Sequence, residues 1–277
     1  MGIHLRVVAC TIFTLLMIET ARGSQQKSIC GDKVSCTIST GQYRIYFPKS
    51  WNHQTQLGAI YYLHGWNGTA LSTISNRALR SIADKHKVAL VAPQGKNGSW
   101  SFPGSPSQDR DEFQFFKELR EDLLRRFPID SERIMISGFS MGASMAWYLA
   151  CYQGELYSGF APVAGAFWKP IPKQCPSRLN FLSHIHGIAD KTVPIAGRPI
   201  GKHWTQANLY ESLDVWKRQA GFEDVIPHSS RQGRLTCKEW SNKTQELELC
   251  LHSGSHSIEI KWVSQAWVKL TKEKNWK

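Results

Sequence analysis

The sequence has no apolar run long enough to cross a membrane. Its most apolar segment, residues 7–18, is shorter than the roughly 20 residues that a spanning helix needs. It also has no internal repeat, no linker rich in proline or glycine and no block of like charges that would divide it. With 42% apolar and 11% aromatic residues, the 277-residue chain can bury one large core, which excludes intrinsic disorder. We therefore expect a single folded domain without stable membrane insertion.

The short apolar segment is typical of an export signal. A basic residue precedes it, and Ala21-Arg22-Gly23 follows it before Ser24. A basic start, a short apolar run and an Ala-x-Gly site predict a secretory signal peptide over residues 1–23, which leaves residues 24–277 as the folded domain. The alternative is a short helix that remains attached as an anchor. The signal predicts a secreted or periplasmic protein.

Cleavage after residue 23 would leave six of the seven cysteines. An even number behind an export signal predicts disulfides formed in an oxidising compartment. Many pairings are possible, and the sequence does not choose among them rigorously. The pairs that proximity along the chain favours are Cys30–Cys36, Cys151–Cys175 and Cys237–Cys250. No Cys-x-x-Cys spacing occurs, so we expect no zinc site and no other metal.

Apolar strands and amphipathic helices alternate along the chain after an N-terminal hairpin in residues 24–55. The short apolar runs typical of buried strands are residues 59–63, 88–92, 133–137, 160–163, 179–185 and 247–251. Helical periodicity is present in residues 74–82, 111–127, 209–216 and 260–270. This alternation predicts an α/β fold, a mostly parallel sheet with helices on both faces. In such sheets the chemistry lies in loops at the carboxyl ends of the strands.

The third apolar run leads into Gly138-Phe139-Ser140-Met141-Gly142, followed by small residues that favour a helix. A G-x-S-x-G sequence between a strand and a helix is the nucleophile elbow of serine hydrolases. The turn is so tight that side chains at Gly138 and Gly142 would clash, and Ser140 is held with its hydroxyl exposed. The positive end of the following helix points at the reacting carbonyl oxygen. We therefore predict Ser140 as the nucleophile; the alternative is a glycine-rich turn in an unrelated α/β protein.

A serine nucleophile needs an acid and a base, which follow it in this order in the chain. Asp190 lies in the loop after the fifth apolar run, and we predict it as the acid. An aspartate in such a loop can also serve as a helix cap or turn former. Its competitors are Asp214, which falls within a helix, and Asp130, which falls in a turn before a strand.

The predicted base is His256, in the loop between the sixth apolar run and the last helix. His252 lies nearer the strand and is interpreted as structural. These two histidines are four residues apart, but Ser-Gly-Ser between them disfavours a helix and hence a metal site. His64 and His186 flank glycines at strand ends and are interpreted as residues that shape loops.

Two backbone N–H groups are candidates for an oxyanion hole. The first strand ends in Leu63-His64-Gly65-Trp66, where a glycine-containing turn can present the Trp66 N–H to a developing negative charge. The second donor is the N–H of Met141, the residue after the nucleophile.

Several segments resemble one family and cover nearly all of residues 24–277 in the same order. They are residues 63–65, 82–86, 91–95, 127–133, 138–142, 186–190 and the loop around His256. The chain resembles secreted α/β-hydrolase esterases, which include feruloyl and acetylxylan esterases and extracellular polyhydroxybutyrate depolymerases. The resemblance implies the α/β-hydrolase fold and ester hydrolysis through Ser140, Asp190 and His256.

The chain departs from that family at two points. The family commonly has Gly-Gly-His followed by Trp-Pro at the histidine loop, whereas this chain has Gly254-Ser255-His256-Ser257-Ile258. Depolymerases often carry an added polymer-binding domain, for which we expect no room here. Both departures weaken the transfer of substrate identity and leave the three catalytic positions intact.

Charge and aromatic residues bear on the substrate. The formal net charge of +12 favours an anionic partner such as an acidic polysaccharide or cell surface, although a generally basic exported protein would show the same excess. No nucleic-acid-binding motif is present, so we expect no nucleic-acid partner. Five aromatic residues fall in or beside loops that could rim the site: Trp66, Trp100, Phe102, Trp168 and Trp204. Of these we predict Trp100 and Trp168 as substrate-binding residues.

Together these features predict a secreted serine esterase without a cofactor. Its expected substrates are esters of short or aromatic acyl groups, carried by a polysaccharide or polyester, which are cleaved through an acyl-enzyme. A peptidase or acyltransferase could use the same three residues. A non-catalytic protein that binds carbohydrate or a surface is a third alternative, which the three filled catalytic positions disfavour.

Overall fold

The computed structural model describes residues 1–2 and 30–276. The predicted signal peptide, apart from its first two residues, therefore lies outside the described residues. Within the described part, none of the helices combines the length and apolarity needed to span a bilayer.

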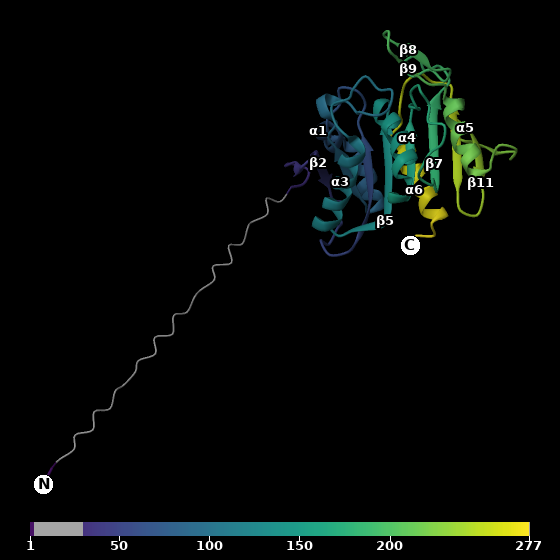
Figure 1. The fold of residues 1–277 in the computed structure, drawn as a ribbon. Helices are drawn as coiled ribbons and strands as arrows, with labels where there is room; N and C mark the ends of the chain where they lie inside the picture. Colours follow the sequence, from purple (N-terminus) through teal and green to yellow (C-terminus); the bar gives the residue numbers. More distant parts are fainter. Residues whose placement is uncertain (3–29, 277) are drawn as a thin grey trace.

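A ten-stranded sheet runs through the centre of the molecule (Figure 1). Its strands in chain order are β1 (Cys36–Ile38), β2 (Gly41–Tyr46), β3 (Leu57–Leu63), β4 (Ala89–Pro93), β5 (Ile129–Phe139), β6 (Gly159–Val163), β7 (Phe181–Gly187), β10 (His228–Gln232), β11 (Leu235–Ser241) and β12 (Glu246–His252). Across the sheet their order is β1-β2-β4-β3-β5-β6-β7-β12-β11-β10. The six strands from β4 to β12 pair in parallel, and antiparallel strands border them on both sides.

Helices cover both faces of the sheet. They are α1 (Ala70–Ser75), α2 (Arg77–His86), α3 (Glu112–Arg126), α4 (Met141–Gln153), α5 (Leu209–Ala220) and α6 (Lys261–Glu273). Within β3, Ala59, Tyr61 and Leu63 belong to the core that includes α3, α4 and α5. Ile60 and Tyr62 belong to the core that includes α1, α2 and α6. A strand buried on both sides explains the unbroken apolar runs, and the predicted α/β-hydrolase fold is confirmed.

Two local features differ from the expected elements. The helix predicted over residues 74–82 is two helices, because Asn76 ends α1 and accepts the N–H groups of Ala78 and Leu79 as the N-cap of α2. The structure also contains a separate hairpin of β8 (Arg198–Ile200) and β9 (Trp204–Gln206), which the sequence patterns did not reveal.

Three disulfides join the six cysteines in the pairs that chain proximity favoured, Cys30–Cys36, Cys151–Cys175 and Cys237–Cys250. The last pair joins directly opposed residues of β11 and β12. Within the described residues, the one group spaced like metal ligands is Cys237, Glu248 and Cys250, and its two sulfur atoms are bonded to each other.

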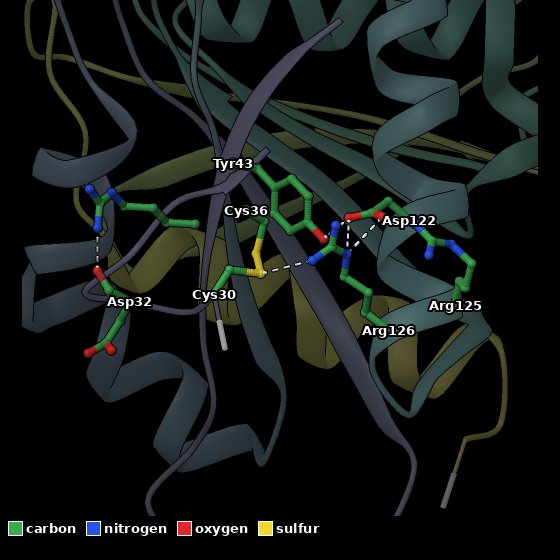
Figure 2. The surroundings of a disulfide bond; sticks show 8 residues. Cys30, Asp32, Cys36, Tyr43, Asp122, Arg125 and Arg126 are labelled. Atoms are coloured by element: carbon green, nitrogen blue, oxygen red, sulfur yellow. Dashed lines mark hydrogen bonds and ion pairs between the residues drawn. A yellow bond between two sulfur atoms is a disulfide. The ribbon is translucent and has the colours of Figure 1, made fainter. Parts of the chain in front are cut away.

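Charged residues of α3 hold the first disulfide against the body of the protein (Figure 2). Arg126 Nη1 lies 3.8 Å from Cys30 Sγ, and the same guanidinium pairs with Asp122 at 2.8 Å. Asp122 also accepts a hydrogen bond of 2.8 Å from the hydroxyl of Tyr43 on β2. The segment before the sheet is thereby tied to a helix that packs on the core.

A buried charge cluster joins α6 to β11 and β12. Lys269 Nζ lies 2.7 Å from a carboxylate oxygen of Glu239, 2.6 Å from Glu246 and 2.8 Å from Glu248. One ammonium thus serves three carboxylates. Burial raises the pKa of Glu246 to about 7, although the nearby Lys269 partly opposes this shift.

Candidate active site

The turn between β5 and α4 holds Ser140 in a strained backbone conformation. Its φ of 58° and ψ of −120° lie in a region that L-residues other than glycine rarely adopt. Two hydrogen bonds of 3.0 Å fix the turn: the Ser140 N–H donates to the Val163 carbonyl, and the Ser140 carbonyl accepts from the Ser144 N–H. This geometry is the nucleophile elbow expected from the sequence.

Both glycines of the elbow are needed for close backbone packing. A Cβ atom at Gly138 would lie 2.8 Å from backbone atoms of Gly142 and 2.9 Å from the Leu63 carbonyl oxygen. A Cβ atom at Gly142 would overlap the carbonyl oxygens of Leu63 and His64. The end of β3 therefore lies against the elbow, which brings the loop after β3 to the nucleophile.

Asp190 and His256 meet beside this turn. His256 Nδ1 lies 2.7 Å from Asp190 Oδ2, and the His256 ring lies 4.6 Å from the ring of Phe139, the residue before the nucleophile. Asp190 Oδ1 accepts the N–H groups of Thr192 and Val193, both at 2.8 Å. Three donors thus converge on one buried carboxylate.

These contacts fix the charge of Asp190 and the tautomer of a neutral His256. Burial tends to raise the pKa of Asp190, but the hydrogen bonds from His256, Val193 and Thr192 outweigh it and keep the pKa below its usual value. An ionised Asp190 accepts a hydrogen bond from His256 Nδ1–H, which leaves the lone pair of Nε2 free. An imidazole in this state can act as a general base.

The competing residues occupy other environments. Asp130 accepts a hydrogen bond from the Glu132 N–H, and Asp214 pairs with Lys217 on α5. His252 Nδ1 accepts the Gly254 N–H at 3.0 Å, and its buried ring packs 4.9 Å from that of Trp262. Burial lowers the pKa of His252, which suits the structural interpretation.

His64 shapes the loop that would form the oxyanion hole. The Gly95 N–H donates to His64 Nε2 at 3.0 Å, so the ring proton is on Nδ1 and points to the Gly65 carbonyl at 2.8 Å. Burial lowers the pKa of His64, which keeps the ring neutral. The adjacent Trp66 N–H has no acceptor among the described residues. The Met141 N–H lies in the first turn of α4, where N–H groups have no partner within the helix.

Trp100 does not contact the cavity, and its prediction as a substrate-binding residue is wrong. Its side chain is 0% exposed, and its indole N–H donates to the His64 carbonyl at 2.8 Å. The turn at residues 96–98, in which Asn97 has a φ of 52°, precedes an indole that packs inward against Phe116. Trp100 thus supports the loop after β3 from within. Phe102 is buried as well.

A cavity of about 580 Å³ opens at Ser140. Ser140 and Met141 line it, together with Trp168. The further lining residues are Trp66, Asn97, Ser99, Pro106, Ser107, Asp109, Ser144, Thr192, Val193, Arg198, Ile200, Trp204 and Gln206. Four of these residues come from the β8–β9 hairpin, and no sequence pattern indicated that this segment reaches the site.

A chain of buried histidines lies next to Asp190. The indole N–H of Trp147 donates to His184 Nδ1 at 3.3 Å, so His184 Nε2–H donates to His186 Nδ1 at 3.0 Å. His186 Nε2–H in turn donates to the Val193 carbonyl at 2.7 Å. Burial lowers the pKa of both histidines, which keeps them neutral. The chain thereby holds the carbonyl of Val193, the residue whose N–H binds Asp190, which is consistent with a loop-shaping role for His186.

Comparison with known proteins provides independent information. The esterase family model, described as "Putative esterase", matches residues 39–270. NocK from Nocardia uniformis subsp. tsuyamanensis, described as an esterase, is 24% identical over 70% of this chain and 63% of its own length. Feruloyl esterase C from Aspergillus terreus is 24% identical over 71% of this chain and 74% of its own length. Poly(3-hydroxyalkanoate) depolymerase C from Paucimonas lemoignei is 26% identical over 42% of this chain and 26% of its own length.

The chain thus spans less than two thirds of the length of NocK and of the depolymerase. The fold is shared with acetyl xylan esterase from Aspergillus awamori, with a TM-score of 0.61, 14% identity and coverage of 82% of this chain and 93% of that one. Feruloyl esterases, acetylxylan esterases and depolymerases are the types that the sequence resembled.

Proposed function

The chain belongs to the esterase family, and we propose that it is a serine esterase that cleaves carboxylic esters through an acyl-enzyme on Ser140. The observation that carries this proposal is the hydrogen bond between His256 and Asp190 next to an elbow whose serine lines a cavity. In the proposed roles, Ser140 is the nucleophile, His256 the general base and Asp190 the residue that orients it.

The reaction would proceed in two halves. Ser140 Oγ attacks the ester carbonyl carbon while His256 Nε2 accepts the hydroxyl proton, and the carbonyl oxygen becomes negative. The tetrahedral intermediate then collapses, and the imidazolium returns the proton to the departing alcohol. A water molecule, deprotonated by His256, attacks the acyl-enzyme in the same way and releases the acid and the free serine.

The negative oxygen would be stabilised by the N–H groups of Trp66 and Met141. Both belong to segments held in place by buried contacts, so the donors need no rearrangement during the reaction. The helix dipole of α4 adds favourable potential at its N-terminus.

The shape of the cavity favours short or aromatic acyl groups. Trp168 forms a buried wall, and Trp66 and Trp204 complete an aromatic lining suited to stacking on phenolic groups or sugars. The names of the relatives accord with this substrate class, feruloyl and acetyl esters on polysaccharide or hydroxyalkanoate polyesters. The disulfides and the predicted signal peptide support a secreted or periplasmic enzyme.

Labelling with a fluorophosphonate probe tests the nucleophile directly. Wild type should be labelled and should hydrolyse p-nitrophenyl acetate, and Ser140→Ala should lose both properties while its thermal unfolding stays unchanged. The matched control is Ser229→Ala on the exposed edge strand β10, which should keep both. If Ser140→Ala retained more than a few per cent of the activity, another residue would be the nucleophile.

A further inference from the structure

The β8–β9 hairpin forms one wall of the cavity and is fixed in place. The Lys169 N–H donates to the Thr205 carbonyl at 2.8 Å, and the Ala207 N–H donates to the Phe167 carbonyl at 3.0 Å. These two bonds pair β9 with the segment that carries Trp168. The hairpin stands at the opposite end of the molecule from the C-terminus (Figure 1). Its side chains therefore form a permanent part of the mouth of the site.

The segment that contains this hairpin is basic and has no acidic residue. Between Asp190 and Glu211 it carries Lys191, Arg198, Lys202 and His203, which we call the basic rim. All four side chains are exposed, and none has an ion-pair partner among the described residues. Elsewhere in the described residues nine lysines and arginines form ion pairs. One of them is Lys169, next to this segment, which pairs with Glu211.

Arg198 is the member of the basic rim that lines the cavity. Its Nε–H lies 2.9 Å from the Thr192 carbonyl and 3.3 Å from Gln206 Oε1. These contacts fix the guanidinium at Nε and leave the two terminal nitrogens without an acceptor among the described residues. A guanidinium held in this way is preorganised to bind a carboxylate through two parallel hydrogen bonds.

The acidic residue of the cavity wall lies outside the β8–β9 hairpin. Asp109 is the acidic residue among those that line the cavity, and its carboxylate accepts hydrogen bonds from Asn97 and Ser107, both at 3.1 Å. Lys96 Nζ donates to the Asp109 carbonyl at 2.8 Å, which places a positive charge nearby. Arg198 is the basic residue among those that line the cavity, so an anionic ligand would meet its favourable potential at the hairpin.

From this arrangement we propose that the basic rim binds carboxylates of an acidic polysaccharide, so that the enzyme prefers ester groups carried by polymers of uronic acid. This inference rests on the proposed esterase function. The buried walls at Met141 and Trp168 would enclose the acyl group, while exposed Arg198 contacts the part of the substrate that extends outward. Lys202 and His203, beyond Arg198 on the hairpin, would contact further carboxylates, which favours a polymer over a single anionic group.

The test compares two forms of one polymer: acetylated polygalacturonate, and the same polymer after its carboxyl groups have been reduced to alcohols. For wild type we expect kcat/KM to be about tenfold higher on the carboxylated form at low salt, and nearly equal on both forms at about 1 M salt, where charges are screened. Each variant is judged by the ratio between the two polymers.

Arg198→Gln should reduce this ratio to about two or three, and Lys202→Gln should reduce it about twofold, as expected for exposed charges. Because Arg198 also holds the Thr192 carbonyl, its substitution can lower both rates, and the ratio isolates the effect of the charge. Lys272→Gln removes the same charge in the last turn of α6 and should leave the ratio unchanged. This turn is next to the C-terminus, which stands at the opposite end of the molecule from the hairpin.

A wild-type ratio near one, with hydrolysis of p-nitrophenyl acetate intact, would overturn this inference and leave the esterase function standing. An equal loss on both polymers in Arg198→Gln, with no effect of Lys202→Gln, would show that Arg198 is structural and would also overturn it. Acceleration by anionic lipid vesicles without a preference between the polymers would assign the basic rim to a membrane surface instead. If wild type neither reacted with fluorophosphonate nor hydrolysed any ester, the proposed function would itself fail.

Discussion

Asp190→Asn tests the proposed roles of the acid and the base with little change in shape. In the wild type, Asp190 Oδ1 accepts two N–H groups and Oδ2 accepts His256 Nδ1–H. The asparagine oxygen must take the first position, because the Thr192 and Val193 N–H groups need an acceptor there. Its NH₂ group then faces His256 Nδ1 and favours the tautomer with the proton on Nε2. That nitrogen can no longer accept the proton of Ser140.

We expect kcat/KM to fall about 10³- to 10⁴-fold, which corresponds to about 4–5.5 kcal/mol of lost transition-state stabilisation. The loss should be similar across neutral and mildly alkaline pH, because the lowered pKa keeps Asp190 of the wild type ionised throughout this range. The assay is hydrolysis of p-nitrophenyl acetate, together with thermal unfolding, where we expect a cost of about 1 kcal/mol.

The matched control is Asp214→Asn, which changes the same groups on a half-exposed face of α5 and should retain full activity. If Asp190→Asn retained more than a tenth of the wild-type rate, Asp190 would not orient the base. If the variant unfolded several degrees earlier and lost activity in proportion, the residue would be structural.

Four further outcomes are expected from other parts of the molecule. His256→Ala should abolish turnover, and His252→Ala should preserve it at reduced stability, as shown by paired activity and melting measurements. Trp100→Phe should lower kcat more than it raises KM for p-nitrophenyl acetate, because it removes a hydrogen bond that supports the oxyanion loop without touching the cavity. Burial raises the pKa of Glu246 to about 7, so the folded protein binds more protons at this group than the unfolded protein between about pH 4.5 and 7. The unfolding free energy should therefore fall as the pH rises through this range, and Glu246→Gln should remove about 2–3 kcal/mol of that fall. Denaturation at several pH values measures it, and an unchanged slope would contradict the prediction. Denatured but unreduced protein without its signal peptide should contain no free thiol, whereas two or more thiols per chain would contradict the three disulfides.

The elbow could be predicted from the sequence because its determinants are contiguous. Gly138 and Gly142 are required by backbone packing within a single turn, and their spacing is visible in five residues. The meeting of Asp190 and His256 follows from a coarser property, since each comes after a buried strand and the parallel strands β7 and β12 are neighbours. Topology therefore brings together residues that are 66 positions apart.

Side-chain direction in loops could not be predicted in the same way. Trp100 and Trp168 both follow strands and both are buried, yet Trp168 borders the cavity and Trp100 packs beneath the oxyanion loop. The difference depends on local backbone dihedrals such as that of Asn97. The β8–β9 hairpin was missed because its strands are only three residues long and have no apolar alternation. Gly197 starts it with a φ of 74°, and an added Cβ there would overlap the Gln206 carbonyl oxygen.

Two residues, Thr192 and Val193, connect the proposed catalytic acid to Arg198 on one side and to His186 on the other. The N–H groups of Thr192 and Val193 bind Asp190 Oδ1, while the carbonyl of Thr192 accepts from Arg198 and that of Val193 accepts from His186. The acid, the basic rim and the buried histidine chain thus share one short loop. Since residues that share a partner are energetically coupled, substitutions at Arg198 and Asp190 should be non-additive. A loss of activity in Arg198→Gln alone could result from displacement of Asp190 and would therefore say little about the charge of the substrate. The ratio between the two polymers separates that effect from the binding of a substrate carboxylate.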